Sequence, residues 1–141
     1  MKRTLASLIT ALLMIGTFSA FAAEKPNPLK DFSSKRILES YLEAITQGNS
    51  TVNKFLFAPD FEYRNSANNR VYSKKAYLSF LKASEKLVYN CKSTYSILDE
   101  CGVECVAKIT MVFDTFTRVD HISLNKSKEG WQVYKVVTTY P

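Results

Sequence analysis

The stretch Phe116–Val137, FTRVDHISLNKSKEGWQVYKVV, decides how this chain folds. It holds two segments in which apolar and polar residues alternate, separated by the polar loop Asn125–Gly130. Alternation with a period of two is typical of β-strands with one buried face, so this stretch predicts an antiparallel hairpin. Asp120 lies in phase with Ile122 and Leu124. A carboxylate is therefore expected on the buried face, where a charge is costly unless it has a partner or a role.

The segment before this hairpin predicts two further strands, so that four strands follow one another as a meander. From Lys86 onward, the residues expected on one face are Leu87, Tyr89, Cys91, Ser93, Tyr95 and Ile97. After a turn that ends on Gly102, the expected set is Val103, Cys105, Ala107, Ile109, Met111 and Phe113. A two-residue turn then places Phe113 opposite Phe116. After this turn, the even-numbered residues, among them Arg118 and Asp120, are expected to face the core. In the last strand, the residues expected on one face are Trp131, Val133, Lys135 and Val137.

The preceding part of the chain predicts helices and short strands. A helix is expected over residues 34–47, because apolar residues recur there at helical spacing between capping serines and a glycine. A short helix before Pro59, short strands at 61–64 and 70–72, and a helix capped by Ser73 should follow. This order predicts an α+β fold in which three helices pack on one face of a curved, mainly antiparallel sheet. A cone-shaped cavity can remain where such a sheet curves away from its helices.

The N-terminus predicts a secretory signal peptide over residues 1–22. A basic head, Lys2 and Arg3, precedes an apolar run that ends in small residues at alternate positions. The run is shorter than the roughly 20 residues that span a bilayer, so cleavage after Ala22 is expected rather than membrane anchoring. The mature protein is expected in the periplasm or outside the cell.

The remaining chain predicts one domain without a nucleic-acid partner. Residues 23–32 contain two prolines and no periodic pattern, which predicts a flexible lead-in to a single domain over residues 33–141. Loss of the signal peptide lowers the formal net charge of +6 by two, and the remaining charges are scattered. A nucleic-acid binder should show a basic stripe with aromatic platforms, and the sequence shows none.

The three cysteines and the single histidine lack the spacing of a metal site, so no metal or cofactor is expected. The expected strand register places Ile97 opposite Cys105 and Cys91 opposite Met111. Cys91 and Cys105 are then too far apart for a disulfide, and both are expected to be buried thiols. A Cys101–Cys105 bridge in a distorted strand is the alternative. An odd number of cysteines leaves at least one thiol unpaired.

Five motifs carry a resemblance to a known family: Tyr41–Ala44 with Gly48, Leu56–Arg64, Ala107–Lys108, Asp120–Leu124 and Gly130–Val133. In order and spacing they resemble the nuclear-transport-factor-2-like (SnoaL-like) superfamily, which includes ketosteroid isomerases, scytalone dehydratases and polyketide cyclases. Within it, the chain is most similar to the lumazine-binding branch of small bacterial secreted proteins. That branch commonly has a tyrosine where this chain has His121. The resemblance implies the fold and a pocket, and it does not identify lumazine as the ligand.

The catalytic members of that superfamily make Asp120 a candidate acid or base. Ketosteroid isomerases combine a carboxylate base with a tyrosine and a protonated aspartate, and scytalone dehydratases combine a histidine with a carboxylate and tyrosines. His121 is expected on the outer face of the sheet, solvated or in a dimer contact, because neighbouring strand residues point to opposite faces. A His–Asp dyad on one face is therefore not expected.

The residues expected around a pocket are aromatic or cationic. They are Tyr41, Tyr63, Tyr89, Tyr95, Arg118 and Trp131. The alternative for the tyrosines and the tryptophan is a place in the core with one satisfied polar group. The alternative for Asp120 is an ion pair with Arg118 or Arg64.

Three functions are consistent with this sequence. The first is binding of a small, partly apolar molecule, which predicts a mostly apolar pocket with few converging polar groups. The second is an isomerase, dehydratase or cyclase, which predicts that Asp120 reaches the pocket without an arginine bound to it. The third is a protein–protein interaction module, which predicts a filled cone and an exposed apolar sheet face. A homodimer through the outer sheet face is also expected, as in relatives of the superfamily.

Overall fold

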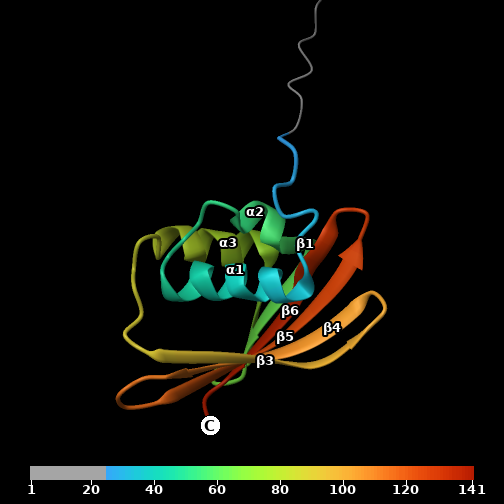
Figure 1. The fold of residues 1–141 in the computed structure, drawn as a ribbon. Coiled ribbons are helices and arrows are strands. Elements are labelled where there is room, and N and C mark those ends of the chain that lie inside the picture. The colour runs from blue at the N-terminus through green and yellow to red at the C-terminus, as the bar shows by residue number, and fades with distance from the viewer. Residues whose placement is uncertain (1–24) are drawn as a thin grey trace, which may run out of the picture.

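Three helices cover one face of a six-stranded sheet in the computed structural model, which describes residues 25–141 (Figure 1). The helices are α1 (Ser34–Thr46), α2 (Asn53–Leu56) and α3 (Lys74–Ala83). The strands are β1 (Phe57–Asn65), β2 (Arg70–Ser73), β3 (Lys92–Cys101), β4 (Glu104–Val112), β5 (Thr117–Ser127) and β6 (Gly130–Thr139). The expected signal peptide lies outside the described residues. Within them, no helix combines the length and the apolar character that crossing a bilayer requires.

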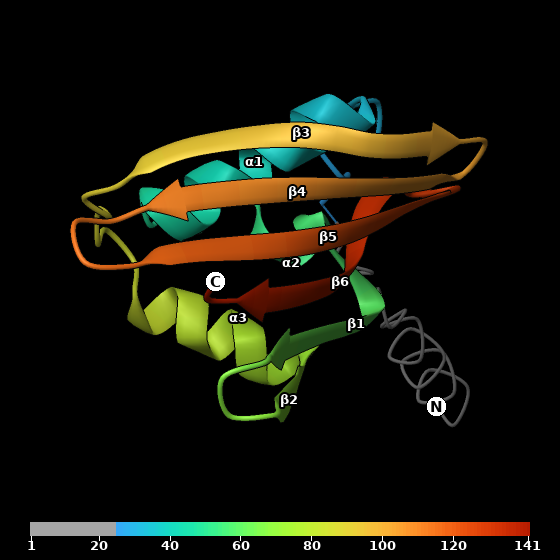
Figure 2. The ribbon, with the colours of Figure 1, turned by 90° about the horizontal axis from the view of Figure 1, so that it is seen from below.

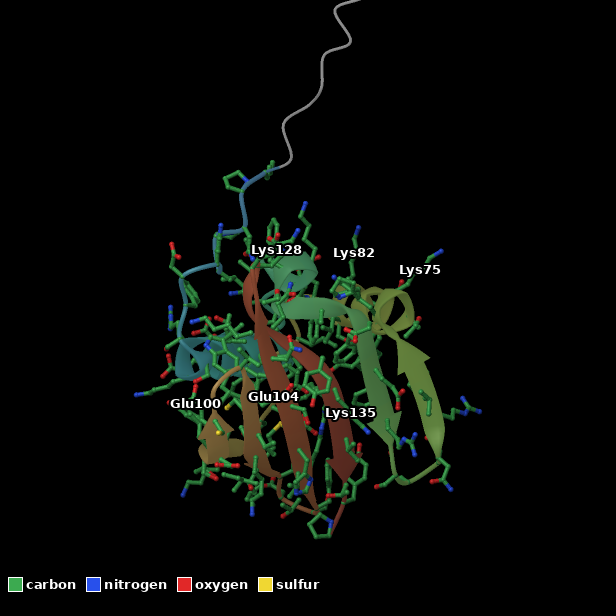
Figure 3. All side chains as sticks on the ribbon, turned by 90° about the vertical axis from the view of Figure 1, so that its right-hand side faces the viewer. Lys75, Lys82, Glu100, Glu104, Lys128 and Lys135 are labelled. Carbon is green, nitrogen blue, oxygen red and sulfur yellow. The ribbon has the colours of Figure 1, made fainter. Side chains whose placement is uncertain are left out.

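The sheet has the strand order β2-β1-β6-β5-β4-β3, which Figure 2 shows from the side opposite the helices. The contact between β1 and β6 is parallel, and the other neighbours are antiparallel. The expected α+β fold, with helices on one face of a curved and mainly antiparallel sheet, is therefore confirmed. Lys75 and Lys82 extend from α3 away from the sheet (Figure 3), so the buried side of this helix faces the strands.

Serine caps start both long helices, as the sequence predicts. The hydroxyl of Ser33 accepts a hydrogen bond from the backbone N–H of Arg36 at 3.2 Å, and the hydroxyl of Ser73 accepts one from Ala76 at 3.3 Å. The apolar stripe of α1 turns Ile37, Leu38 and Tyr41 toward the sheet, and all three side chains are fully buried.

The third strand begins later than the sequence predicts. Residues 86–91 form a connection instead, in which Lys86 adopts a φ of 67° and Tyr89 donates a backbone hydrogen bond to Thr46 at 2.7 Å. The expected register of β3 on β4 is also wrong, because Gly102 and Val103 form the turn and an irregularity follows Ile97. Ile97 therefore lies opposite Ala107, and Cys105 lies opposite Glu100.

The cysteines are unpaired in this arrangement. Cys105 is buried as expected, whereas Cys91 precedes β3 and is only half-buried. Cys101 is exposed beside the turn, opposite Glu104, so the alternative Cys101–Cys105 bridge is not formed.

A β-bulge in β6 changes which side chains face the helices. Val133 pairs with Leu124, but the next pair along the ladder joins Ser123 to Lys135, so β6 contains one additional residue. The expectation that Lys135 and Val137 share one face with Trp131 and Val133 is therefore wrong. Beyond the bulge, the buried residues of β6 are Val136 and Thr138.

The expected flexible lead-in is held against the domain from residue 27 onward. Leu29 is 3% exposed and belongs to the hydrophobic core. The Asn27 side chain donates to the carbonyl of Glu129 at 3.0 Å and accepts from the N–H of Leu29 at 2.8 Å. Gly130 allows this close approach: it adopts a φ of 87°, and a Cβ placed there would lie 2.3 Å from the carbonyl oxygen of Lys30. The domain therefore begins before residue 33.

Replacing Leu29 with alanine tests whether this segment belongs to the folded unit. Loss of a buried leucine should lower the free energy of unfolding by about 2–4 kcal/mol in urea denaturation. Pro28→Ala, at an exposed neighbouring position, serves as the control and should change it by less than about 1 kcal/mol. Equal, small effects of both substitutions would contradict the packing of Leu29.

Candidate ligand-binding cavity

A cavity of about 530 Å³ lies between α3 and the inner face of the sheet. Its lining residues are Tyr63, Asn65, Tyr72, Ala76, Tyr77, Phe80, Tyr89, Phe113, Phe116, Arg118 and Tyr140. They come from β1, β2, α3, the connection before β3, the β4–β5 turn, β5 and the chain end after β6. The cavity thus depends on seven parts of the chain that only the tertiary fold brings together.

Aromatic rings form most of the cavity wall. On the side of β1 and α3, Tyr63 stacks on Tyr77 with 4.7 Å between ring centroids and 19° between ring planes. At the β4–β5 turn, Phe113 stacks on Phe116 at 4.5 Å and 13°. Because β6 separates β1 from β5 in the sheet, these two stacked pairs approach the cavity from different sides. The wall is therefore aromatic on both sides.

Arg118 is the one charged residue that lines the cavity. Its Nε donates to Oδ1 of Asp120 at 2.9 Å, and its Nη2 donates to Oδ2 at 2.9 Å. The guanidinium side chain is 11% exposed and the carboxylate is fully buried. This is a bidentate, buried ion pair between two residues on the same face of β5.

Two hydroxyl groups complete the environment of Asp120. Thr138 on β6 donates to Oδ1 at 2.7 Å, and Tyr41 on α1 donates to Oδ2 at 2.8 Å. Each carboxylate oxygen thus accepts two hydrogen bonds, which offsets the cost of burying the charge. The bulge of β6 is required for this contact, because without it Thr138 would face the outside of the sheet.

Burial and charge shift the pKa values of the groups around this pair. Burial is the largest single influence on the pKa of Arg118 and lowers it, but the charge and hydrogen bonds of Asp120, together with the nearby tyrosines, outweigh it, and the pKa rises above its ordinary value. Burial raises the pKa of Tyr41 and Tyr77, and the nearby Asp120 carboxylate adds to the rise. The arrangement therefore holds a protonated arginine beside neutral tyrosines throughout the physiological pH range.

The structure brings three of the six expected pocket residues to the cavity. Tyr63, Tyr89 and Arg118 line it. Tyr41 lies behind the wall, where its hydroxyl is 3.4 Å from that of Tyr77 and bonds Asp120. Asp120 itself does not line the cavity. The ion pair between Asp120 and Arg118, one of the alternatives expected from the sequence, is present.

Two of the expected pocket residues lie elsewhere. Tyr95 donates its hydroxyl proton to Glu39 of α1 at 2.9 Å, because β3 is the edge strand beyond β4. Trp131 is a core residue at the start of β6, whereas the cavity lies at the other end of that strand, near Tyr140. Arg64, the alternative partner for Asp120, instead pairs with Glu62 at 3.3 Å. His121 is exposed on the outer face, as expected.

Most of the aromatic wall was not expected from the sequence. Phe113 and Phe116 were expected only as neighbours across a turn, and the backbone bond from Phe113 N–H to Phe116 carbonyl at 2.9 Å confirms that turn. Phe80 and Tyr140 are each about half exposed, a property that no alternation pattern predicts. The available signal was a cluster of aromatic residues at segment ends, where strand faces no longer point into the core.

No group of three His, Cys, Asp or Glu side chains within residues 25–141 is placed to hold a metal ion. The polar groups that converge on the cavity are instead Arg118, Asn65 and tyrosine hydroxyls. These groups can donate or accept hydrogen bonds to an organic molecule.

No protein-family model and no curated protein matches this sequence. Solved structures do match. A protein of unknown function from Pectobacterium atrosepticum, of the DUF3225 family, superposes with a TM-score of 0.64 at 17% identity, over 76% of this chain and 87% of that chain. An NTF2-like protein from Cytophaga hutchinsonii gives 0.63 at 12% identity, over 76% and 94%. An NTF2-like protein of unknown function in nutrient uptake from Rhodospirillum rubrum gives 0.63 at 14%, over 77% and 98%.

This chain has the NTF2-like fold. The resemblance inferred from the sequence motifs is therefore confirmed at the level of the fold. The narrower resemblance to the lumazine-binding branch is not confirmed by these similarities. At such identities the NTF2-like fold is shared without implying a shared ligand or activity.

Thr138→Val tests the contribution of the hydroxyl donors to the buried carboxylate. Removing one hydrogen bond to a buried charge should lower the free energy of unfolding by about 1.5–3 kcal/mol in urea denaturation. The control is Thr139→Val, whose hydroxyl makes only a 3.5 Å contact to the carbonyl of Val119. Equal losses for both variants would show that Thr138 contributes no specific stabilisation to Asp120.

Tyr77 should make the folded state sensitive to alkaline pH. Because burial raises its pKa above the ordinary value of 10.0, the folded state keeps a proton that the unfolded state loses. The stabilisation is fully present below about pH 10 and decreases as the pH rises further, by up to about 1.4 kcal/mol per pH unit. Unfolding of the wild type and Tyr77→Phe between pH 9 and 12 measures this, and the variant should show the shallower decline. Parallel declines would contradict it.

Proposed function

We propose that this protein binds a small, partly apolar molecule in the cavity between α3 and the sheet. The observation that carries the proposal is the cavity wall, in which eight of eleven lining residues are aromatic and one is charged. Its volume of about 530 Å³ falls within the roughly 300–1,000 Å³ that ligand sites commonly have. A mostly apolar pocket with few converging polar groups is what a binding protein requires.

Exposed aromatic side chains around the opening support the same function. Phe80, Phe116 and Tyr140 line the cavity and are 53%, 47% and 43% exposed. Leaving aromatic surface in water is unfavourable by about 25 cal/mol per Å². A bound molecule that covers these rings would recover that free energy, so the opening favours an apolar occupant.

The contacts of Asp120 give less support to the enzymatic alternative. As an acid or base, Asp120 would need access to a substrate, yet its carboxylate accepts four hydrogen bonds and does not line the cavity. Binding therefore remains the leading function, and an isomerase, dehydratase or cyclase using Asp120 is the alternative.

The outer face of the sheet supports a homodimer as a second proposal. This face carries half-exposed valines, Val106 and Val112, alongside the exposed His121. Such a mixed surface is compatible with an interface between two copies. An interaction module alone would not need the open cavity, so we propose that dimerisation accompanies ligand binding.

We further propose that the protein acts in the periplasm or outside the cell, after loss of its signal peptide. Native mass spectrometry of protein purified from the periplasm tests these proposals together. A co-purified small molecule would identify the ligand class, and the mass of the complex would give the oligomeric state.

Filling the cavity should abolish binding of an apolar probe. Ala76 lines the cavity from α3, whereas Ala83 is also exposed on α3 but lies outside the lining. We expect Ala76→Trp to weaken binding of the neutral fluorescent probe N-phenyl-1-naphthylamine at least tenfold, measured by fluorescence titration. Ala83→Trp, the matched control, should leave the affinity unchanged. Lack of probe binding by the wild type, or equal binding by both variants, would contradict the proposed function.

A further inference from the structure

One edge of the Arg118 guanidinium remains available to a ligand. Nε and Nη2 are directed to Asp120, and among the described residues no protein atom accepts a hydrogen bond from Nη1. Within residues 25–141, Asn53 Oδ1 is the one fully buried side-chain polar atom that lacks a partner. Nη1, which also lacks a partner, is therefore not fully buried. Nη1 is therefore reached from the cavity that Arg118 lines. An arginine N–H in such a place is a strong donor for an acceptor oxygen.

The ion pair sets the charge that a ligand should carry. Arg118 is the one cation of the cavity wall, and Asp120 already neutralises it through two hydrogen bonds. An anionic ligand would lose its hydration and would meet the buried carboxylate behind the guanidinium, so it gains little from Arg118. A neutral acceptor uses the free N–H without that cost.

The aromatic wall sets the shape of the ligand. The cavity is lined by the stacked pair Tyr63–Tyr77, from β1 and α3, and by the stacked pair Phe113–Phe116, from the β4–β5 turn. A wall of aromatic rings favours an aromatic, and therefore planar, partner, because stacked and edge-to-face contacts add to the gain from apolar burial. A saturated ring system of the same size makes these contacts poorly.

We propose that the cavity selects an uncharged, planar aromatic molecule that carries a carbonyl oxygen, with this oxygen accepting a hydrogen bond from Nη1 of Arg118 and the ring lying against the stacked aromatic pairs. The inference rests on the proposed binding function and adds a ligand class to it. Asp120 is then a positioning residue. It holds the guanidinium in one orientation and does not touch the ligand.

Four bicyclic probes separate the parts of this inference. 2-Quinolone is planar, neutral and carries a carbonyl group. Naphthalene lacks the carbonyl, 1-decalone lacks planarity, and 2-naphthoate carries a full negative charge. Dissociation constants are measured by displacement of N-phenyl-1-naphthylamine from the wild-type protein. We expect 2-quinolone to bind at least tenfold more tightly than each of the other three. Relative to naphthalene, this factor is the increment of one charge-assisted hydrogen bond.

Variants of Arg118 test the assigned donor. Arg118→Lys keeps a cation beside Asp120 but has no planar fork with a free edge, so it should bind 2-quinolone about tenfold more weakly and naphthalene as the wild type does. A second variant, Arg118→Met with Asp120→Asn, removes both charges and leaves no unpaired buried ion. It should bind 2-quinolone and naphthalene with similar affinity. If Arg118→Lys does not fold, this double variant tests the role of Arg118 in its place.

The outcomes distinguish this inference from the proposed function. Normal binding of N-phenyl-1-naphthylamine, together with equal affinities for 2-quinolone and naphthalene, would overturn the ligand class and leave the binding function standing. Tighter binding of 2-naphthoate would overturn the neutral charge, and equal binding of 1-decalone would overturn planarity. An unchanged preference for 2-quinolone in the double variant would overturn the role of Arg118. Failure of the naphthylamine probe to bind the wild type would overturn both proposals.

Discussion

The buried carboxylate of Asp120 is the group on which the arrangement of this protein depends. A full charge at 0% exposure is tolerated only where donors replace its water, and here four hydrogen bonds do so. The donors come from three elements: α1 through Tyr41, β5 through Arg118, and β6 through Thr138. A polar contact of this kind requires one alignment of helix and sheet, because removing a partner from a buried ion pair typically costs about 3–5 kcal/mol. Apolar packing around it tolerates small shifts more readily.

The same network connects the core to the cavity. Asp120 and Tyr41 lie on the core side, while Arg118 and Tyr77 belong to the cavity wall. The hydroxyls of Tyr41 and Tyr77 are 3.4 Å apart, so the polar chain continues from the ion pair toward α3. A cationic donor is thereby held at a fixed place in an otherwise aromatic pocket. Preorganisation of this kind reduces the entropy that a ligand must offset on binding.

The fold and part of this site could be predicted from the sequence. Helical spacing placed α1, and alternation placed Arg118 and Asp120 together on the inner face of β5, because a period of two leaves no other choice. The same alternation gave the wrong faces for the second half of β6. There the bulge turns Val136 and Thr138, instead of Lys135 and Val137, to the inner face. A bulge adds one residue without a distinct sequence signal. The donor Thr138 was missed for that reason.

The sequence by itself determined the α+β class, the serine caps, the inward direction of Asp120 and the outward direction of His121, since these depend on local periodicity and backbone chemistry. Only the tertiary structure decided that Asp120 is bound by Arg118 rather than by Arg64, that Leu29 belongs to the core, and that Trp131 and Tyr95 lie away from the cavity. These outcomes depend on contacts between residues far apart in the chain. Their geometry is set by strand order, register and one bulge, which local patterns do not encode.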